Sequence, residues 1–170
     1  TTFRSMYLGL SAFLDANTER RELLLGQRPP RFDSSFDEAI ALTGDDFERV
    51  ALKAESARDY FLLVGPPGTG KTSRALRRMV EHFYATSSMQ ILLLAYTNRA
   101  VDEICQSLSS ITPCIDYIRV GSELSCDVRF RGHLLENILA ECNSRREVNI
   151  RMADCRVYVG TVASIAAKAE

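Results

Sequence analysis

The sequence lacks the features that would direct it into a membrane or a secretory route. No apolar run is long enough to cross a bilayer, because the longest ones, such as residues 91–96, have the length of a β-strand. Residues 1–14 lack the basic start and the following apolar block of a secretory signal peptide. We therefore expect no membrane partner and a cytoplasmic location, with the nucleus as the alternative in a eukaryote.

The sequence also lacks paired cysteines. Its five cysteines are scattered without a CxxC pair, and it has only two histidines. An odd, unpatterned set of this kind argues against a zinc site and against a disulfide framework. It favours buried thiols in a reducing compartment.

An excess of basic residues is missing as well. The 21 Lys and Arg residues face 22 Asp and Glu residues, which gives a net charge of −1. Dedicated nucleic-acid binders usually carry a basic excess, so net charge gives no support to that role. It does not exclude the role, since a motor protein can concentrate positive charge in one groove.

What is present is a globular composition with two regions of different character. The length of 170 residues suits one domain, and 46% hydrophobic with 25% charged residues is typical of a folded, soluble protein. Residues 1–44 carry helical patterns interrupted by Pro29 and Pro30, and we expect a helical lead-in there. In residues 45–170, helix and strand patterns alternate, which predicts an α/β domain with a parallel sheet flanked by helices. We expect this domain to be incomplete at its C-terminus.

Individual elements are predicted from apolar runs and from helical spacing. Strands are expected at residues 60–64, 91–95, 117–120 and 156–160. In the lead-in, helices are expected near residues 6–14, 19–25 and 35–42. In the α/β region they are expected near residues 47–57, 76–83, 101–108 and 134–142, with a short helical tail after residue 162.

The most specific motif is a glycine-rich segment that fits the pattern G-x-x-x-x-G-K-[ST] between an expected strand and an expected helix. Its glycines let the backbone curl so that N–H groups point at phosphate oxygens, and the next helix adds the free N–H groups of its first turn. The lysine places a charge on the β- and γ-phosphates, and the hydroxyl of Thr72 is a ligand for Mg²⁺. A chance Gly/Pro turn is disfavoured by this context. The sequence therefore predicts an ATP and Mg²⁺ site formed by Gly65, Pro66, Pro67, Gly68, Thr69, Gly70, Lys71, Thr72 and Ser73.

A second motif follows the expected strand at residues 91–95. There Tyr96, Thr97 and Asn98 lead directly into a helix. Polar groups at the carboxyl end of such a strand face the crevice where open α/β folds bind ligands. In one interpretation Thr97 or Asn98 caps the helix. In the other, the hydroxyl and the helix-start amides hold a nucleic-acid phosphate.

Together, the glycine-rich loop and the sequence A-Y-T-N-R-A-V-D at residues 95–102 resemble superfamily 1 helicases of the nonsense-mediated-decay and replication-nuclease branch. The resemblance spans about residues 42–164 and includes weaker segments at residues 119–122 and 157–164. It implies a P-loop, RecA-like motor lobe that grips single-stranded DNA or RNA through Thr97, Asn98 and Thr161. It further implies a second motor lobe of the same parent protein as a partner, and a stalk end at residues 1–44.

The chain departs from the family in the segment that reads adenine. Family members often carry a glutamine ahead of the phosphate loop, and residues 42–50 align with that segment but place Asp46 at the glutamine position. An ionised aspartate accepts from adenine N6 but cannot donate to N7, so adenine selectivity is expected to be weaker. Alternatively, Asp45 and Asp46 simply cap the next helix.

A second departure concerns catalysis. Hydrolysis in this class needs an Asp-Glu pair at the end of a later strand to hold Mg²⁺ and to position water. No apolar strand here ends in Asp-Glu, so we expect no catalytic residue within this chain and very slow hydrolysis by it alone. An AAA+ remodelling ATPase would need that pair within about residues 109–130, where none occurs. That alternative and a non-catalytic nucleotide-binding interaction module stay open.

Overall fold

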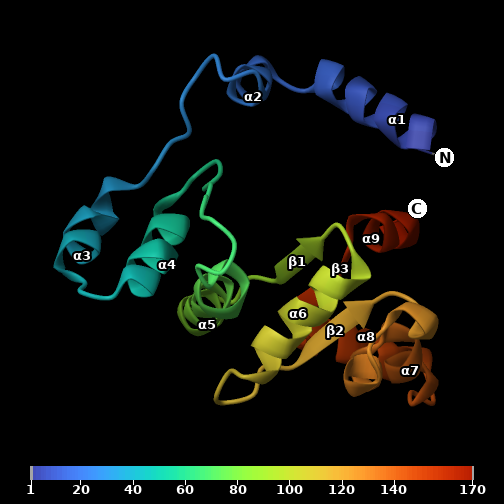
Figure 1. The fold of residues 1–170 in the computed structure, drawn as a ribbon. Helices are drawn as coiled ribbons and strands as arrows, with labels where there is room; N and C mark the ends of the chain where they lie inside the picture. The colour runs from blue at the N-terminus through green and yellow to red at the C-terminus, as the bar shows by residue number, and fades with distance from the viewer. Residues whose placement is uncertain (1, 170) are drawn as a thin grey trace. The chain divides into compact units, whose positions relative to one another are not determined.

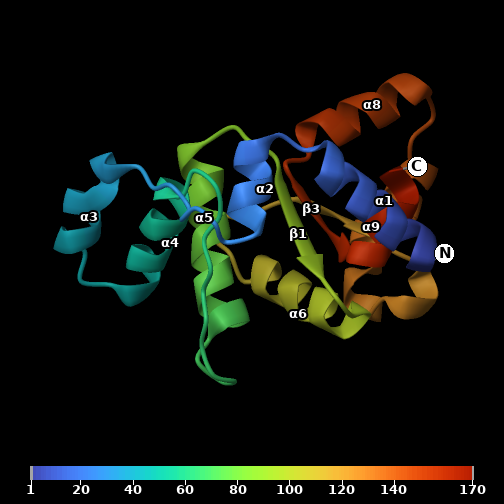
Figure 2. The same ribbon diagram turned by 90° about the horizontal axis from the view of Figure 1, so that it is seen from above.

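The computed structural model describes residues 2–169, which form two compact units (Figure 1 and Figure 2). The first unit contains the described residues up to Leu42 together with Leu52–Leu62. The second contains Thr43–Ala51 and the described residues from Leu63 onward. Helix α4 (Asp46–Ser56) contributes residues to both units. No helix among residues 2–169 is both long and apolar enough to span a bilayer.

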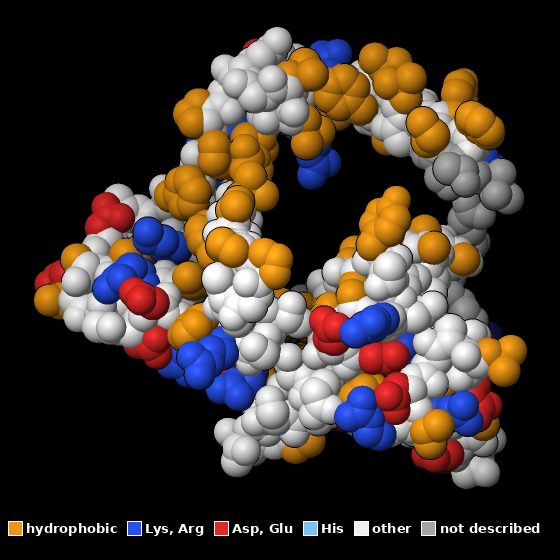
Figure 3. Space-filling model, in the orientation of Figure 1, with side chains coloured by type: hydrophobic (Ala, Val, Ile, Leu, Met, Phe, Trp, Pro, Cys, Tyr) orange, Lys and Arg blue, Asp and Glu red, His pale blue; other side chains and the backbone are white. Residues whose placement is uncertain are grey.

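The first unit contains the helices predicted for the N-terminal region, which are confirmed. They are α1 (Thr2–Asp15), α2 (Thr18–Leu24) and α3 (Asp37–Leu42), with a 3₁₀ turn (Ser34–Phe36) ahead of α3. The side chain of Asn17 caps α2 by accepting from the backbone N–H of Arg20 at 2.8 Å. Hydrophobic side chains are exposed along the N-terminal helices (Figure 3), and on α1 they include Phe3, Met6 and Tyr7.

One carboxylate holds distant parts of the first unit together. Asp59 accepts from the guanidinium groups of Arg28 and Arg31, each at 2.9 Å, and from the backbone N–H of Arg31 at 2.8 Å. The hydrogen bonds from Arg28 and Arg31 keep the pKa of Asp59 far below its usual range. An antiparallel bridge between Phe32 and Ala57 lies next to this cluster in the sequence. Residues 28–32 are thereby joined to residues 57–59.

The second unit is built on a parallel three-stranded sheet. Strands β1 (Ile91–Ala95) and β2 (Tyr117–Val120) flank the central strand β3 (Val157–Thr161), so the order is β1-β3-β2. Ala95 lies opposite Thr161, and Val120 lies opposite Gly160. The predicted strands at residues 91–95 and 117–120 are confirmed, and the last strand begins one residue later than predicted. The parallel sheet with its helices is consistent with the expected P-loop, RecA-like α/β class.

Helices pack against this sheet around two hydrophobic clusters. Helix α6 (Asn98–Ser109) contacts β1 and β3. The main cluster contains buried side chains of α6 and of all three strands, with Val101, Leu108 and Val159 each at most 1% exposed. A smaller cluster contains Ile118, Ile138 and Cys155, and it involves α7 (Leu135–Ala140). The predicted helices at residues 47–57, 101–108 and 134–142 and the helical tail, α9 (Val162–Ala169), are confirmed.

Helix α8 (Arg145–Asp154) was not predicted. Its sequence, with Val148, Ile150 and Met152 at every second position, lacks the apolar periodicity of a helix, and the helix buries no residue. Its signal is the cap instead: Ser144 accepts from the backbone N–H of Glu147 at 3.2 Å, and the Glu147 carboxylate accepts from the backbone N–H of Asn143 at 2.6 Å.

The prediction of a strand at residues 60–64 is wrong. This segment has no strand hydrogen bonds, and the side chains of Leu62 and Val64 are 74% and 91% exposed. An apolar run becomes a strand only where a neighbour completes its backbone hydrogen bonds. The central strand β3 is already paired on both sides, and no described strand pairs with the outer edge of β1 or β2. The hydrophobic pattern indicates a tendency to form a strand, but a strand forms only where a neighbouring strand is available to pair with it.

Candidate functional site

The predicted phosphate loop is a tight turn that only glycine accommodates at two positions. Gly68 and Gly70 have φ angles of +82° and +80°, in the left-handed region that L side chains rarely adopt. A Cβ atom on Gly70 would also lie 3.3 Å from the side chain of Arg74. The chain becomes helical directly after Gly70, first as a π-helical turn (Lys71–Leu76) and then as α5 (Arg77–Thr86), which confirms the predicted helix.

The loop is held closed by its own side chains. The ammonium group of Lys71 donates to the carbonyl of Pro66 at 2.7 Å and also to the carbonyl of Gly65. The hydroxyl of Thr69 donates to the same Pro66 carbonyl at 2.8 Å. A lysine ammonium has three N–H donors, and these two carbonyls accept two of them. The cation is thus positioned over the loop with donor capacity remaining for an anion.

The loop forms one wall of a cavity of about 790 Å³. Six of the nine predicted loop residues line it, and Gly65, Pro66 and Thr69 do not. Helix α6 forms another wall, and its Ser107 hydroxyl donates to the carbonyl of Thr72 at 3.2 Å. The lining residues are Pro67, Gly68, Gly70, Lys71, Thr72, Ser73, Arg99, Asp102, Glu103, Gln106, Ser107, Asp127 and Arg129.

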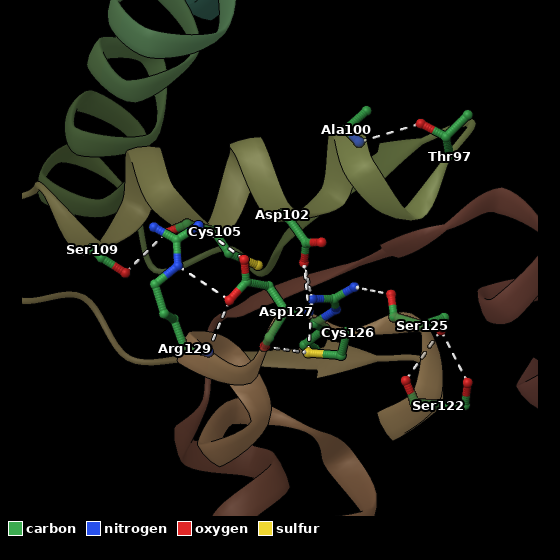
Figure 4. A network of polar contacts seen from close by, with 11 residues as sticks. Thr97, Ala100, Asp102, Cys105, Ser109, Ser122, Ser125, Cys126, Asp127 and Arg129 are labelled. Atoms are coloured by element: carbon green, nitrogen blue, oxygen red, sulfur yellow. Dashed lines mark hydrogen bonds and ion pairs between the residues drawn. The ribbon is translucent and has the colours of Figure 1, made fainter.

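Two cavity residues that sequence reasoning missed form a clamp (Figure 4). The guanidinium of Arg129 donates to both carboxylate oxygens of Asp127, at 3.1 and 3.0 Å. It also donates to the side-chain oxygen of Gln106 at 2.7 Å. Hydrogen bonds from the side chain and the backbone of Arg129 lower the pKa of Asp127 to about 2. No short motif marks these residues, because residues 106 and 127–129 come together only in the folded chain.

A buried arginine lies behind this wall. Arg119 on β2 is 1% exposed and forms an ion pair with Asp102 on α6. Its guanidinium also donates to the carbonyl of Ser125 at 3.2 Å and to the sulfur of Cys126 at 2.8 Å. The backbone N–H of Asp127 donates to the same Asp102 carboxylate at 3.5 Å (Figure 4). A buried charge is tolerated only when it is paired in this way.

The three predicted nucleic-acid residues lie at the carboxyl edge of the sheet and do not line the cavity. Thr97 caps α6, because its hydroxyl oxygen accepts from the backbone N–H of Ala100 at 3.2 Å (Figure 4). Asn98 is the first residue of α6. Thr161 is 8% exposed, and its hydroxyl oxygen accepts from the backbone N–H of Ser164 at 3.0 Å at the start of α9. The capping interpretation is therefore correct for Thr97.

The two neighbouring aspartates ahead of the loop, Asp45 and Asp46, have different roles. Asp45 caps α4, since its carboxylate accepts from the backbone N–H of Phe47 at 2.9 Å. Asp46 instead pairs with Arg49 at 2.7 Å, and its side chain is 87% exposed. Within the second unit, Glu48 forms an ion pair with Arg78 of α5, which fixes this segment to the helix that follows the loop.

Comparison with known proteins assigns the chain to a family. A model of the AAA domain family of the AAA_11 type matches residues 42–159, which is more than half of the chain. The chain belongs to this family. The match of this AAA domain covers the phosphate loop, the cavity wall on α6 and most of β3.

Curated relatives of this AAA domain carry the names of helicases. A DNA replication ATP-dependent helicase/nuclease of Arabidopsis thaliana is 34% identical over 134 residues, which are 72% of this chain and 10% of that protein. An uncharacterized ATP-dependent helicase of Methanocaldococcus jannaschii is 28% identical over 124 residues, 71% of this chain and 19% of that protein. The RNA helicase Mov10l1 of Mus musculus is 29% identical over 106 residues, 61% of this chain and 8% of that protein.

These matches confirm the resemblance to superfamily 1 helicases. These relatives are all named for helicase activity. The chain spans about a tenth of the length of the Arabidopsis thaliana relative and about a fifth of the Methanocaldococcus jannaschii relative.

Proposed function

We propose that this chain is part of the first motor lobe of an ATP-dependent nucleic-acid helicase or translocase. The observation that carries the proposal is the phosphate loop: two left-handed glycines, a lysine ammonium positioned over the loop, and a helix that starts at that lysine. This loop lies within the matched AAA domain, and the relatives are ATP-dependent helicases.

The loop residues fit a nucleoside triphosphate. A side chain at Gly65 would place its Cβ 3.0 Å from the hydroxyl of Thr69, so a larger residue there would crowd the side chain that holds the loop closed. The first-turn N–H groups after Gly70 attract anions, and the remaining donor of Lys71 is available to the β- and γ-phosphates. Thr72 is the residue that would ligate Mg²⁺, whose chemistry is to neutralise the phosphates.

The sheet edge fits the backbone of a single strand. Helices α6 and α9 both begin at this edge, because β1 and β3 are paired with Ala95 opposite Thr161. Thr97 and Thr161 cap them, and the remaining first-turn N–H groups are donors for phosphate oxygens. Asn98 adds a side-chain amide at the start of α6. Contacts to phosphates do not distinguish one base from another. The motor would therefore tolerate any sequence and would accept single-stranded DNA or RNA.

Hydrolysis and stepping require groups that these motifs do not supply. A second motor lobe of the same parent protein would provide arginines, and an Asp-Glu strand end would position the attacking water. We propose that ATP closes the two lobes on the strand and that hydrolysis reopens them. The 170-residue chain itself should bind nucleotide and hydrolyse it very slowly.

The test is to measure both ligands on the same chain. A slowly hydrolysed ATP analogue with Mg²⁺ is titrated by calorimetry, with AMP as the comparison, and a labelled single-stranded oligonucleotide is titrated by anisotropy. Binding of the analogue well above AMP, together with binding of the oligonucleotide, supports the motor lobe. Nucleotide binding without any oligonucleotide binding would favour the nucleotide-binding interaction module, and absence of both would overturn the proposal.

A further inference from the structure

One cation of the cavity belongs neither to the phosphate loop nor to helix α6. Arg129 lines the cavity together with Lys71 and Thr72, and its side chain is 62% exposed. It lies in a 3₁₀ helix (Val128–His133) between β2 and β3 in the sequence. The cavity thus receives positive charge from a segment that the glycine-rich motif does not include.

Hydrogen bonds connect Arg129 with the loop residue that would ligate Mg²⁺. Its guanidinium donates to Gln106 at 2.7 Å. The next residue of α6, Ser107, donates from its hydroxyl to the carbonyl of Thr72 at 3.2 Å. In a phosphate loop the Mg²⁺ at this threonine bridges the β- and γ-phosphates. Arg129 therefore lies on the side of the cavity where the end of a triphosphate chain is expected.

Arg129 is held in one orientation and still has donors to offer. Its contacts with Asp127 and Gln106 use three of the five N–H groups of a guanidinium, so within residues 2–169 two remain available. The anchor is firm, because the backbone N–H of Asp127 donates to Asp102, which pairs with the buried Arg119. An arginine that is already positioned loses little conformational entropy when it binds a phosphate.

The charge of the cavity lining favours an anion. Each of the three carboxylates of the lining is paired with an arginine: Asp102 with Arg119, Glu103 with Arg99 and Asp127 with Arg129. Among the described residues, the ammonium of Lys71 contacts carbonyls and no carboxylate, so its charge is not neutralised. When the three pairs cancel, the charge of Lys71 remains.

We propose that Arg129 binds the γ-phosphate of the nucleotide and distinguishes triphosphates from diphosphates. The inference rests on the proposed function, and it assigns to this chain itself a cation at the end of the phosphate chain. A guanidinium suits this role, because its planar set of N–H groups matches the oxygens of a phosphate. The carboxylate of Asp127 opposes the contact, since it offsets the charge of Arg129 and repels a phosphate. The two members of one ion pair should therefore have opposite effects on affinity.

The test compares ligands that differ by one phosphate. Calorimetry on the 170-residue chain measures a slowly hydrolysed ATP analogue and ADP, each with Mg²⁺. Arg129→Ala should weaken binding of the ATP analogue about tenfold and that of ADP by less than about twofold. Inorganic tripolyphosphate should show the same loss as the ATP analogue, because the base takes no part. Arg129→Lys, which keeps the charge but not the planar group, should lie between the unsubstituted chain and Arg129→Ala.

Arg131→Ala is the matched control. Arg131 is two positions away, pairs with Glu123 at 2.8 Å and does not line the cavity. Its removal should leave both affinities unchanged.

Asp127→Asn separates phosphate binding from a structural role. Asparagine keeps a side-chain oxygen to accept from the backbone N–H of Arg129, as the carboxylate does at 3.0 Å, but it removes the negative charge. Affinity for the ATP analogue should therefore rise about threefold. If the pair were merely structural, Arg129→Ala and Asp127→Asn would both weaken binding, and they would weaken ADP as much as the ATP analogue.

The outcomes separate the inference from the proposed function. If the unsubstituted chain binds the ATP analogue and Arg129→Ala, folded by circular dichroism, binds it equally well, the γ-phosphate contact is refuted while the nucleotide site stands. Equal losses for the ATP analogue and ADP would also refute the contact. If the unsubstituted chain binds no nucleotide, the nucleotide part of the proposed function fails and the inference falls with it, whereas single-strand binding is judged by its own titration.

Discussion

The buried ion pair between Asp102 and Arg119 allows a quantitative prediction about stability. Asp102→Ala removes the carboxylate that pairs with Arg119 and that accepts from the backbone N–H of Asp127. Arg119 keeps the carbonyl of Ser125 and the sulfur of Cys126 as partners, but it is 1% exposed and cannot regain water. Removing one member of a buried pair costs about 3–5 kcal/mol. Because Asp102 is 22% exposed, we expect the lower end, about 3 kcal/mol.

A neighbouring pair on the same helix supplies the control. Glu103 pairs with Arg99 at 3.7 Å, with the two side chains 61% and 92% exposed, so Glu103→Ala should change stability by well under about 1 kcal/mol. Thermal unfolding followed by circular dichroism should show a fall of about 6–12 °C for Asp102→Ala, at about 2–4 °C per kcal/mol for a chain of this size. Asp102→Asn, which keeps an acceptor, should lie between the two. Equal midpoints for Asp102→Ala and Glu103→Ala would refute the structural role assigned to Arg119.

Three further predictions concern the loop, a thiol and a helix cap. Gly70→Ala places an alanine in the left-handed region, which costs about 1–2 kcal/mol of conformational strain. Calorimetry should therefore show weakened nucleotide binding, and unchanged affinity would contradict the loop geometry. Burial raises the pKa of Cys105 to about 11, so the unfolded state loses this proton first, and stability should decrease as the pH rises from about 9 towards 11. In urea titrations at these pH values, Cys105→Ala should reduce that slope, and an unchanged slope would assign the effect elsewhere. Ser144→Ala removes the N-cap of α8, which should destabilise that helix by about 0.5–2 kcal/mol. Hydrogen exchange should then accelerate in Arg145–Asp154 but not in α6.

Much of the second unit follows from local sequence patterns. The strands at residues 91–95 and 117–120 were predictable because the first is a short apolar run and the second is apolar apart from Arg119, and a third strand pairs with both of them. The loop was predictable because its glycines and lysine are required by its own geometry. The segment at residues 60–64 has the same local pattern, but a strand also needs a neighbour, which a local pattern does not reveal.

The walls of the cavity were not predictable for a related reason. Arg129 reaches Gln106 across 23 positions of sequence while it also binds Asp127, and no spacing rule links Gln106 to the other two residues. The sequence marks Arg119 only through a weak family resemblance, whereas its burial against Asp102 depends on the packing of α6 on the sheet. Helix α8 escaped prediction because its signal lies in its cap rather than in apolar periodicity.

The central claim, that the loop is a working nucleotide site, is tested most directly by calorimetry on Lys71→Ala. Lys71 is held over the loop by the carbonyl of Pro66, whereas Lys53 is an exposed lysine on α4 and serves as the matched control. We predict that the unsubstituted chain and Lys53→Ala bind the ATP analogue with Mg²⁺ equally well and that Lys71→Ala loses the signal. Equal binding by Lys71→Ala, in a chain whose circular dichroism shows it folded, would contradict the account.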